Sequence, residues 1–242
     1  MSPTIDIHSH ILPKIDDGAE SFDMSMAMLR IAYEDGIDGI ILTPHYKPGH
    51  HNACQEKITF LAGKLRQEMR KENRDIRLYV GNEIYYHEGM FRELEEGRAS
   101  AMAGSSYILT EFGPMERFEY IRGGIYEILA HGYRPILAHG ERYNSILGKV
   151  DSVEELIRMG CSVQINAGSV MGKAGFGAKQ FARRLLKEEL VQFVASDAHN
   201  ADKRKPELAD CGNYIRRKYG EDYAANLLYR NPMHVIKNEY IG

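Results

Sequence analysis

The chain alternates short apolar runs with longer segments in which apolar residues recur every three or four positions. Several of the short runs are apolar nearly throughout, which is typical of parallel strands buried on both faces. The longer segments have the period of amphipathic helices, and the clearest helical faces lie within residues 58–69, 121–129 and 181–186. The predicted strands cover residues 5–8, 39–43, 77–81, 107–111, 135–139, 162–166 and 192–196.

Glycine marks the ends of several predicted helices. Gly36, Gly132 and Gly160 each follow a helical segment and stand a few residues before the next strand, which favours the left-handed position that closes a helix. Alternating strands and helices predict parallel strands joined by right-handed crossovers. We therefore expect residues 1–242 to form a single α/β domain, a distorted (β/α)7 barrel of the TIM type. Extra C-terminal helices are predicted at 208–219, at 223–229 and beyond Pro232.

Composition narrows the class of protein. The 242 residues are 43% hydrophobic and 27% charged, as in ordinary globular domains, and the net charge of -3 argues against nucleic-acid binding. Cys54, Cys161 and Cys211 are odd in number and widely spaced, so we expect reduced thiols in a cytoplasmic protein. The segment Met1 to Thr4 lacks the basic and apolar regions of a signal peptide, and no apolar run reaches the roughly 18 residues of a membrane span.

Residues of the metal-binding type follow nearly every predicted strand. His8 and His10 close the first strand, and Asp197 and His199 close the last. Residues two positions apart on a strand point the same way, so each pair can aim two ligands at one place. In a barrel, the carboxyl ends of all strands meet at one face. The other residues at strand ends or in the following loops are Asp16, Asp17, His45, Glu83, Glu111, His139, Arg142 and Arg204.

The metal hypothesis competes with a simpler one. A single His or Glu at a strand end is more often solvated or hydrogen-bonded than bound to a metal. Several carboxylates in one crevice would repel one another unless cations neutralised them, so the combined pattern predicts a metal cluster with His and carboxylate ligands. Some histidines lie outside the pattern: we expect surface or capping positions for His87, His131 and His234, and an exposed loop for His50 and His51.

Three further sequence features bear on substrate binding and catalysis. The segment Gly172–Gly177 lacks the spacing of a phosphate-binding P-loop, and we expect a loop before a helix. Tyr85 and Tyr86 fit either an aromatic wall beside a substrate ring or ordinary packing. Cys211 and Arg217 have the C-x5-R spacing of cysteine-dependent tyrosine phosphatases, but they fall in a helical pattern that cannot form the phosphate cradle. We therefore expect no catalytic cysteine.

The ordered set of motifs resembles the polymerase and histidinol phosphatase (PHP) superfamily. The H-x-H motif alone is weak evidence, but together with the E-I-Y-Y and H-x-E-R-Y elements it is much more specific, and the resemblance runs over essentially the whole chain. Within the superfamily, the chain looks like the manganese-dependent protein-tyrosine phosphatases of bacterial capsule and exopolysaccharide synthesis. The motifs are Ile5–His10, Asp16–Gly18, Thr43–His45, Gly81–Tyr86, His139–Tyr143 and Ala195–Asn200.

That resemblance implies a barrel holding two or three divalent ions, manganese first, with iron or zinc as alternatives. Arg142 and Arg204 match the positions expected to grip the phosphate. Gly140 stands where relatives often carry an apolar residue, and we expect a looser turn before Arg142. The implied metal sites are His8, His10, Glu83 and Asp197; then Glu83, as a bridge, with Glu111 and His139; and lastly Asp17, His45 and His199.

The implied reaction is hydrolysis of phosphotyrosine by a metal-bound hydroxide, with the ions and both arginines holding the phosphoryl charge. The leaving phenolate has a pKa of about 10, so its protonation matters less than for an alkyl ester. His45, His199 and a metal-bound water stay open as proton donors. The resemblance also implies a partner, the phosphotyrosine tail of a membrane-linked bacterial kinase, and through it peripheral association with the membrane.

Two other functions stay open at this point. Another PHP phosphoesterase, such as a histidinol-phosphate phosphatase, would use a similar metal set under a more closed pocket. A metal-binding module without catalysis, such as a scaffold for the kinase, would not need both Arg142 and Arg204, so their presence argues against it.

Overall fold

The computed structural model describes residues 3–241 and contains parallel strands at the predicted places. Two predicted strands, 39–43 and 77–81, are each followed, after a two-residue break, by a short further strand that the sequence pattern did not predict. The backbone breaks at Thr43–Pro44 and at Gly81–Asn82, and Asn82 ties the two breaks together, since its side-chain nitrogen donates to the carbonyl of Pro44 at 3.0 Å. The strands are β1 (Ile5–Ser9), β2 (Gly39–Leu42), β3 (His45–Tyr46), β4 (Arg77–Val80), β5 (Glu83–Tyr85), β6 (Tyr107–Glu111), β7 (Arg134–Leu137), β8 (Ser162–Asn166) and β9 (Phe193–Ala195).

The strands form a curled parallel sheet whose first and last members meet. One sheet has the order β1-β2-β4, and the other has the order β3-β5-β6-β7-β8-β9. A bridge between Ser9 and Ala198 joins the end of β1 to the segment after β9. The amide of His10 donates to the carbonyl of Ala198 at 2.8 Å, and the amide of Asp197 donates to that of His8 at 3.0 Å. The expected meeting of the first and last strands is therefore confirmed, as is the α/β barrel-like fold.

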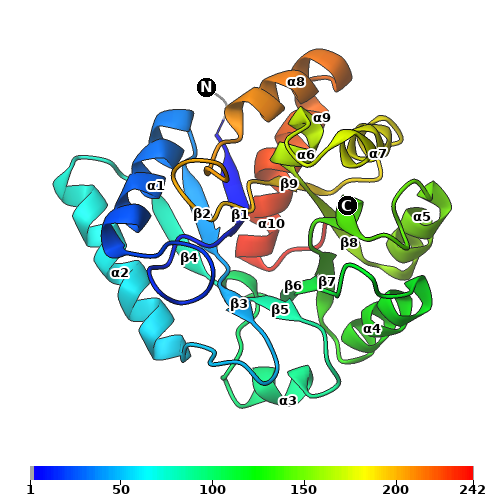
Figure 1. Cartoon of the computed structure of the whole chain (residues 1–242), viewed down its shortest axis with the longest axis horizontal. Helices are drawn as coiled ribbons and strands as arrows, with labels where there is room; N and C mark the ends of the chain where they lie inside the picture. The colour runs from blue at the N-terminus through cyan, green and yellow to red at the C-terminus, as the bar shows by residue number, and fades with distance from the viewer. Residues whose placement is uncertain (1–2, 242) are drawn as a thin grey trace.

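Helices surround the strands on the outside (Figure 1). The predicted left-handed glycines are confirmed, since Gly36, Gly132 and Gly160 have φ values of 89°, 81° and 108°. The connections β1–β2, β6–β7, β7–β8 and β8–β9 each join two paired parallel strands through a helix, as crossover connections require, whereas the helix between β3 and β4 joins strands that pair with β5 and β2. The helices before β9 are α1 (Phe22–Asp35), α2 (Gln55–Lys71), α3 (Met90–Glu95), α4 (Phe118–Ala130), α5 (Val150–Met159), α6 (Ala167–Met171) and α7 (Phe176–Lys187), with 3-10 turns η1 (Met102–Gly104) and η2 (Gly140–Arg142).

The C-terminal segment forms the predicted extra helices. These are α8 (Ala209–Tyr219), α9 (Glu221–Ala225), the π-helical segment η3 (Asn226–Arg230) and α10 (Asn231–Lys237). The last of them reaches the interior of the barrel, because Val235 is fully buried in one apolar cluster with the inward residues Ile5, Ile136 and Phe193. The lumen is therefore a packed core and not a channel. Met1 and Ser2 belong to the segment that was compared with a signal peptide, and they lie outside the described residues.

Candidate metal centre

The nine predicted metal-ligand residues gather at the carboxyl ends of the strands. His8, His45, Glu83 and Glu111 stand on strands, and the other five lie in the loops that follow them. Eight of the nine have less than a fifth of their side chain exposed, and the exception is Asp17, at 67%. The barrel thus brings together residues spread over almost 200 positions of the chain, namely His8, His10, Asp17, His45, Glu83, Glu111, His139, Asp197 and His199.

The histidine pair at the end of β1 faces two carboxylates. The Nε2 atoms of His8 and His10 lie 3.2 Å apart. Nε2 of His8 is 3.3 Å from Oε1 of Glu83 and 3.5 Å from Oδ1 of Asp197. Nε2 of His10 is 3.3 Å from Oε2 of Glu83 and 3.6 Å from Oδ1 of Asp197. These four side chains therefore offer converging nitrogen and oxygen atoms at one point.

Glu83 is the centre of the cluster. Its Oε2 lies 2.8 Å from Nδ1 of His45, and its Oε1 lies 2.9 Å from Nε2 of His139. Glu111 contacts the same two rings, at 3.0 Å from His45 and 3.9 Å from His139. The pairing of His45 with Glu83 in the β3–β5 register explains the first contact. A carboxylate surrounded by imidazoles in this way has the position of a bridging ligand.

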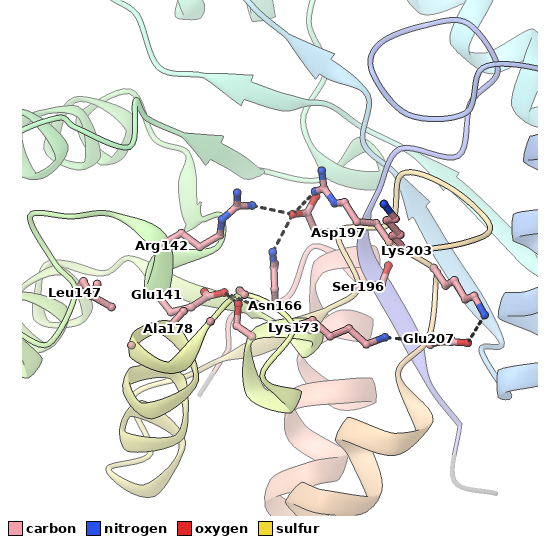
Figure 2. A pocket seen from close by; sticks show the side chains of 17 residues that line it. Glu141, Arg142, Leu147, Asn166, Lys173, Ala178, Ser196, Asp197, Lys203 and Glu207 are labelled. Atoms are coloured by element: carbon pink, nitrogen blue, oxygen red, sulfur yellow. Dashed lines mark hydrogen bonds and ion pairs between the residues drawn. The ribbon is translucent and has the colours of Figure 1, made fainter.

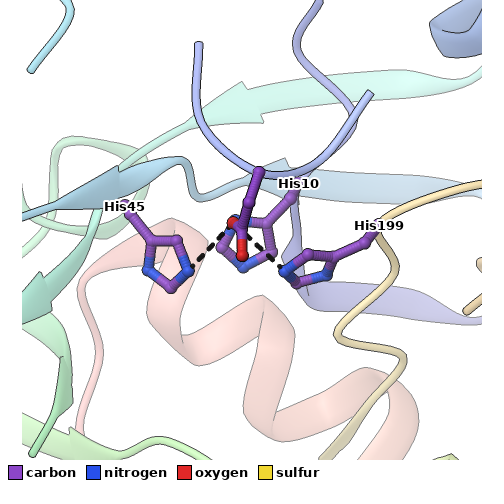
Figure 3. Close-up of side chains that lie close together, drawn as sticks. His10, His45 and His199 are labelled. Carbon is purple, nitrogen blue, oxygen red and sulfur yellow. Dashed lines mark ion pairs between the residues drawn. The ribbon is translucent and has the colours of Figure 1, made fainter. Parts of the chain in front are cut away.

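A third group forms around the loop after β1. Oδ1 of Asp17 lies 3.3 Å from Nε2 of His45 and 3.5 Å from Nε2 of His199. Figure 3 shows the rings of His10, His45 and His199 close together. The arrangement adds His10 to the three residues that the sequence assigned to a third site.

The cluster fits a divalent metal on two observations. Its chemistry is that of His and carboxylate donors with no thiol. Several of its buried atoms also make no well-directed hydrogen bond among the described residues, although the first of them lies 2.8 Å and 3.0 Å from the next two: Nδ1 of His45, Oε2 of Glu83, Oε1 of Glu111 and Nδ1 of His139. Buried polar atoms are nearly always satisfied, so a concentration of orphaned atoms at one place indicates a missing ligand. A cation would satisfy the oxygen atoms and the His45 nitrogen at once.

The close contacts between imidazole rings and carboxylates shift the pKa values of both kinds of group. Burial alone would lower the pKa of His8, but the carboxylates of Glu83 and Asp197 raise it to about 9. Burial also opposes protonation of His45, yet Asp17, Glu111 and Glu83 raise its pKa to about 12. Conversely, burial would raise the pKa of Glu83, but the surrounding imidazoles hold it well below its usual range. Cations are therefore favoured strongly in this crevice, whether protons or metal ions.

The backbone carries strain at two of these residues. His139 and Asp197 have φ values of 36° and 52°, in the left-handed region that costs a non-glycine residue about 1 kcal/mol or more. Gly140 follows directly, and the turn to Arg142 is closed by a 2.9 Å hydrogen bond from its amide to the His139 carbonyl. A Cβ atom at Gly140 would lie 3.0 Å from Cγ1 of Val163, so the glycine allows close packing here. Such strain is typical of functional positions.

Sequence reasoning did not assign three residues that hold the cluster in place. Oδ2 of Asp16 accepts from Nδ1 of His10 at 2.7 Å and from the amide of His45 at 3.0 Å. The other two lie on β8: Oε1 of Gln164 is 3.0 Å from Nδ1 of His8, and Nδ2 of Asn166 donates to Oδ2 of Asp197 at 2.8 Å. The alternation of apolar and polar residues along β8 could have identified Gln164. Val163 and Ile165 on either side of it are buried in the outer core, so the Gln164 side chain faces the lumen.

The two predicted phosphate-gripping arginines stand beside the cluster. An Arg142 nitrogen lies 3.3 Å and an Arg204 nitrogen 2.7 Å from Oδ2 of Asp197. Both line a cavity of about 260 Å³ whose other walls include Lys47, Phe112 and Tyr143. Their side chains are 48% and 42% exposed, so a ligand entering this cavity can reach them.

The remaining predictions from the sequence can now be compared with the structure. His131 caps the end of helix α4, as expected, and its ring stacks on Phe91 with centroids 3.6 Å apart. His50 and His51 lie exposed in a loop, as expected. Tyr86 is buried and packs against Phe112, at 5.1 Å between ring centroids, whereas Tyr85 is only partly buried. Cys211 is buried in helix α8, where burial raises its thiol pKa to about 12, so it has no properties of a nucleophile.

A β/α barrel with His and carboxylate side chains gathered at its carboxyl end defines the class of metal-dependent hydrolases. Residues 4–237 match the family described as "Capsular polysaccharide synthesis, CpsB/CapC". The chain belongs to this family. It is 36% identical over 242 residues to the tyrosine-protein phosphatase CpsB of Streptococcus pneumoniae. The alignment covers 98% of this chain and 100% of that protein.

Solved structures agree with the assignment. The fold matches a crystal structure from a study of YwqE from Bacillus subtilis and CpsB from Streptococcus pneumoniae, described as metal-dependent tyrosine phosphatases, with a TM-score of 0.91, 31% identity and coverage of 98% and 96%. A histidinol phosphate phosphatase from Lactococcus lactis shares the fold alone, with a TM-score of 0.57, 13% identity and coverage of 90% and 94%. Within residues 3–241, no helix is both long and apolar enough to cross a bilayer.

Proposed function

We propose that this protein is a metal-dependent protein-tyrosine phosphatase with its active site at the cluster around Glu83. The observation that carries the proposal is the convergence of nine His, Asp and Glu side chains beside two arginines. The similarity to tyrosine-protein phosphatases and to the structure of a metal-dependent one supports it. One PHP-type domain, residues 1–242, would perform the whole reaction.

The ligand sets follow the contacts. His8, His10 and Asp197, with Glu83 beside them, would hold one ion, and Glu83 with Glu111 and His139 a second. His45 stands close enough to Glu83 and Glu111 to serve the second ion or the third, which Asp17 and His199 would complete. Manganese is the proposed ion, with iron or zinc as alternatives, because no ligand is a thiol.

When bound, such ions lower the pKa of a coordinated water toward about 7 and so supply a nucleophile at neutral pH. The protein's own contribution is to position and to neutralise. Arg142 and Arg204 flank the cavity and present planar forks, which suit two hydrogen bonds to phosphoryl oxygens. Lys47, whose Nζ lies 3.4 Å from Glu111, adds a further positive charge at the same mouth.

The leaving phenolate needs little help, because its pKa is only about 10. His45 and His199 both line the cavity and contact Asp17, so either ring, when it holds a proton and not the third ion, can pass that proton to the departing oxygen; otherwise water would supply it. The buried Phe112 and Tyr143 form an aromatic part of the cavity wall.

The proposed substrate is the phosphotyrosine tail of a bacterial tyrosine kinase that regulates capsule or exopolysaccharide synthesis, reached by peripheral association with the membrane-linked kinase. The capsular family and the tyrosine phosphatases that this chain resembles support this partner. A cytoplasmic location is proposed on the same basis and on the three unpaired cysteines, which suit a reducing compartment.

The test is phosphate release from a phosphotyrosine peptide by the purified protein loaded with manganese, alongside metal analysis. We expect turnover that is lost in EDTA and restored by manganese. The rival substrate class is tested by histidinol phosphate in the same assay, and faster turnover of histidinol phosphate than of the peptide would replace this proposal with the rival. Tight peptide binding without phosphate release at any metal concentration would favour a non-catalytic module.

A further inference from the structure

A second cavity lies directly beside the metal centre. It has a volume of about 620 Å³, within the range of sites that hold small ligands or side chains. Arg142, Asp197 and Arg204 line both this cavity and the smaller one over the metal ligands, so they form a wall between the two. Figure 2 shows Arg142, Asn166 and Asp197 at this wall, and Lys173, Lys203 and Glu207 further along the same hollow.

The second cavity is rich in positive charge. Five of its lining residues are cationic and three are acidic. Two of the acidic residues are already engaged, since Asp197 pairs with both arginines and the fully buried Glu141 accepts from Ser169 at 2.5 Å. Only one exposed acid then faces three lysines; these residues are Glu207 and Lys173, Lys203 and Lys205.

Glu207 already shows which kind of group these lysines accept. Its Oε2 lies 3.6 Å from Nζ of Lys173, and its Oε1 lies 3.8 Å from Nζ of Lys205. Both distances are long for ion pairs, and all three side chains are at least a third exposed. Such pairs contribute little to stability, so an incoming anion can compete with Glu207 for the lysines. Among the described residues, Lys203 makes no ion pair and is available outright.

The backbone leaves this cavity open. Gly168, Gly175 and Gly177 line it, and nothing lies within 4 Å of a Cβ atom built on Gly175 or Gly177. Helix α7 starts here without a side-chain cap, at Gly175. Free amides at a helix start add to the attraction for an anion, although it is the lysines that define the site.

We propose that this cavity, the lysine subsite (Lys173, Lys203 and Lys205), binds a second anionic group on the substrate, within a few residues of the phosphotyrosine. The inference rests on the proposed function, because it takes the phosphotyrosine phosphate to sit on the far side of the wall formed by Arg142 and Arg204. An extended peptide advances about 3.3 Å per residue, so neighbouring side chains can enter the two adjoining cavities. The lysines would recognise negatively charged oxygen atoms, which an Asp or Glu carboxylate and a second phosphotyrosine share.

The experiment compares phosphotyrosine peptides that differ only in flanking charge. One set carries a single Glu at successive positions from three before to three after the phosphotyrosine, a second set carries phosphotyrosine there, and the reference carries Gln. We expect the full-length manganese-loaded protein to show about a tenfold higher kcat/KM for the best anionic peptide than for the Gln reference, chiefly through KM. The gain should shrink with added salt. A larger gain for phosphotyrosine than for Glu would identify a phosphorylated cluster as the natural ligand.

Substitution then locates the effect. In Lys173→Gln/Lys203→Gln/Lys205→Gln, we expect the ratio of kcat/KM between the anionic and the Gln peptide to fall to about one. A matched variant with the same loss of charge at exposed positions of α2 and α7, Lys57→Gln/Lys64→Gln/Lys187→Gln, should keep the ratio of the unaltered protein. Because the readout is a ratio within each variant, a general loss of activity does not imitate the expected result.

The outcomes separate the two proposals. If the unaltered protein cleaves the Gln peptide but gains nothing from any anionic neighbour, the lysine subsite is wrong and the phosphatase assignment stands. A gain that survives the triple lysine substitution also overturns the subsite. If the unaltered protein releases phosphate from none of the peptides, the proposed function fails, and the subsite fails with it.

Discussion

The side-chain oxygen of Gln164 lies 3.0 Å from Nδ1 of His8, and it also accepts the amide of His139 at 3.0 Å. One side-chain amide on β8 therefore holds the ring of His8 and the backbone of His139 without being a proposed ligand itself. Holding the proton on Nδ1 of His8 leaves the lone pair on Nε2, the atom that faces Glu83 and Asp197.

Replacement of Gln164 should weaken metal binding. We expect Gln164→Leu to raise the apparent Kd for manganese about 10- to 100-fold, because the His8 ring loses the partner that fixes its tautomer and orientation. Metal-dependent activity titrations and metal analysis measure this. The matched control is Gln192→Leu, which removes a hydrogen bond of 2.8 Å to the amide of Val163 but touches no ring. Equal changes in Kd for both variants would contradict a positioning role.

Protons should compete with metal ions. The surrounding carboxylates, against the effect of burial, raise the pKa of His8 to about 9 and that of His45 to about 12, so both rings hold protons that a metal ion must displace near neutral pH. We expect affinity for manganese to rise between about pH 6 and 9, with net proton release on binding. Calorimetry in buffers of different ionisation enthalpy measures that release. Binding independent of pH would be inconsistent with this electrostatic picture.

The stability of the chelator-treated protein should have the opposite dependence. A histidine whose folded pKa is raised stabilises the fold fully below its usual value of 6.5, and that contribution is lost as the pH rises through about 9 for His8. The carboxylates of Glu83 and Asp197 have lowered pKa values, so their contribution is lost only on acidification. Without metal, Tm should therefore fall from about pH 6.5 to about pH 9.5, and manganese should reduce that fall. Thermal unfolding monitored by circular dichroism provides the measurement.

The arginines should act on the phosphate and not on the metal. We expect Arg142→Ala and Arg204→Ala each to lower kcat/KM for a phosphotyrosine peptide by about 100- to 1,000-fold while metal content stays near that of the unaltered protein. Lysine at either position should restore little, because it lacks the planar fork. Arg184→Ala, on the exposed side of α7, serves as the control. Loss of metal in the Arg142 or Arg204 variants would instead indicate that they only hold Asp197.

No cysteine should be needed for turnover. Cys211→Ser is expected to keep activity within about twofold, at a cost of about 1 kcal/mol of stability for placing a hydroxyl in an apolar site. Urea unfolding and the peptide assay separate the two effects. Thiol alkylation that abolishes turnover, with activity persisting in EDTA, would reverse the assignment of mechanism.

The sequence predicted the barrel well because its signals are local. Apolar runs, helical periods and the glycines at 36, 132 and 160 each depend on neighbouring residues, and the structure has all of them. The short strands β3 and β5 were not predicted, because the break at Pro44 that precedes β3 is completed by Asn82, which lies 38 positions away and donates to the proline carbonyl. Pairing of that kind depends on the closed sheet and leaves no local pattern.

The candidate site was predictable in its members but not in its geometry. Strand-end positions predicted that His, Asp and Glu side chains would gather at one face of the barrel, since topology fixes their place, and the family resemblance then selected the nine proposed ligands. The proximity of His45 to both Glu83 and Asp17 depends on the β3–β5 register and on a loop conformation. Asp16 was seen only as a neighbour of Asp17, although it holds His10. The lysine cavity was not foreseen, because the loops that form it meet only after β8 and β9 are side by side.

The last helix has a consequence for anyone who trims or extends the chain at its C-terminal end. Val235 of α10 belongs to the same packed interior as Ile5 and Phe193, on the strands whose far ends carry the proposed ligands. The C-terminal helix is therefore part of the barrel core and not a dispensable extension. If a variant without α10 lost activity, the cause would be a cavity in the barrel core that water can enter, and not the loss of a residue that acts on the substrate.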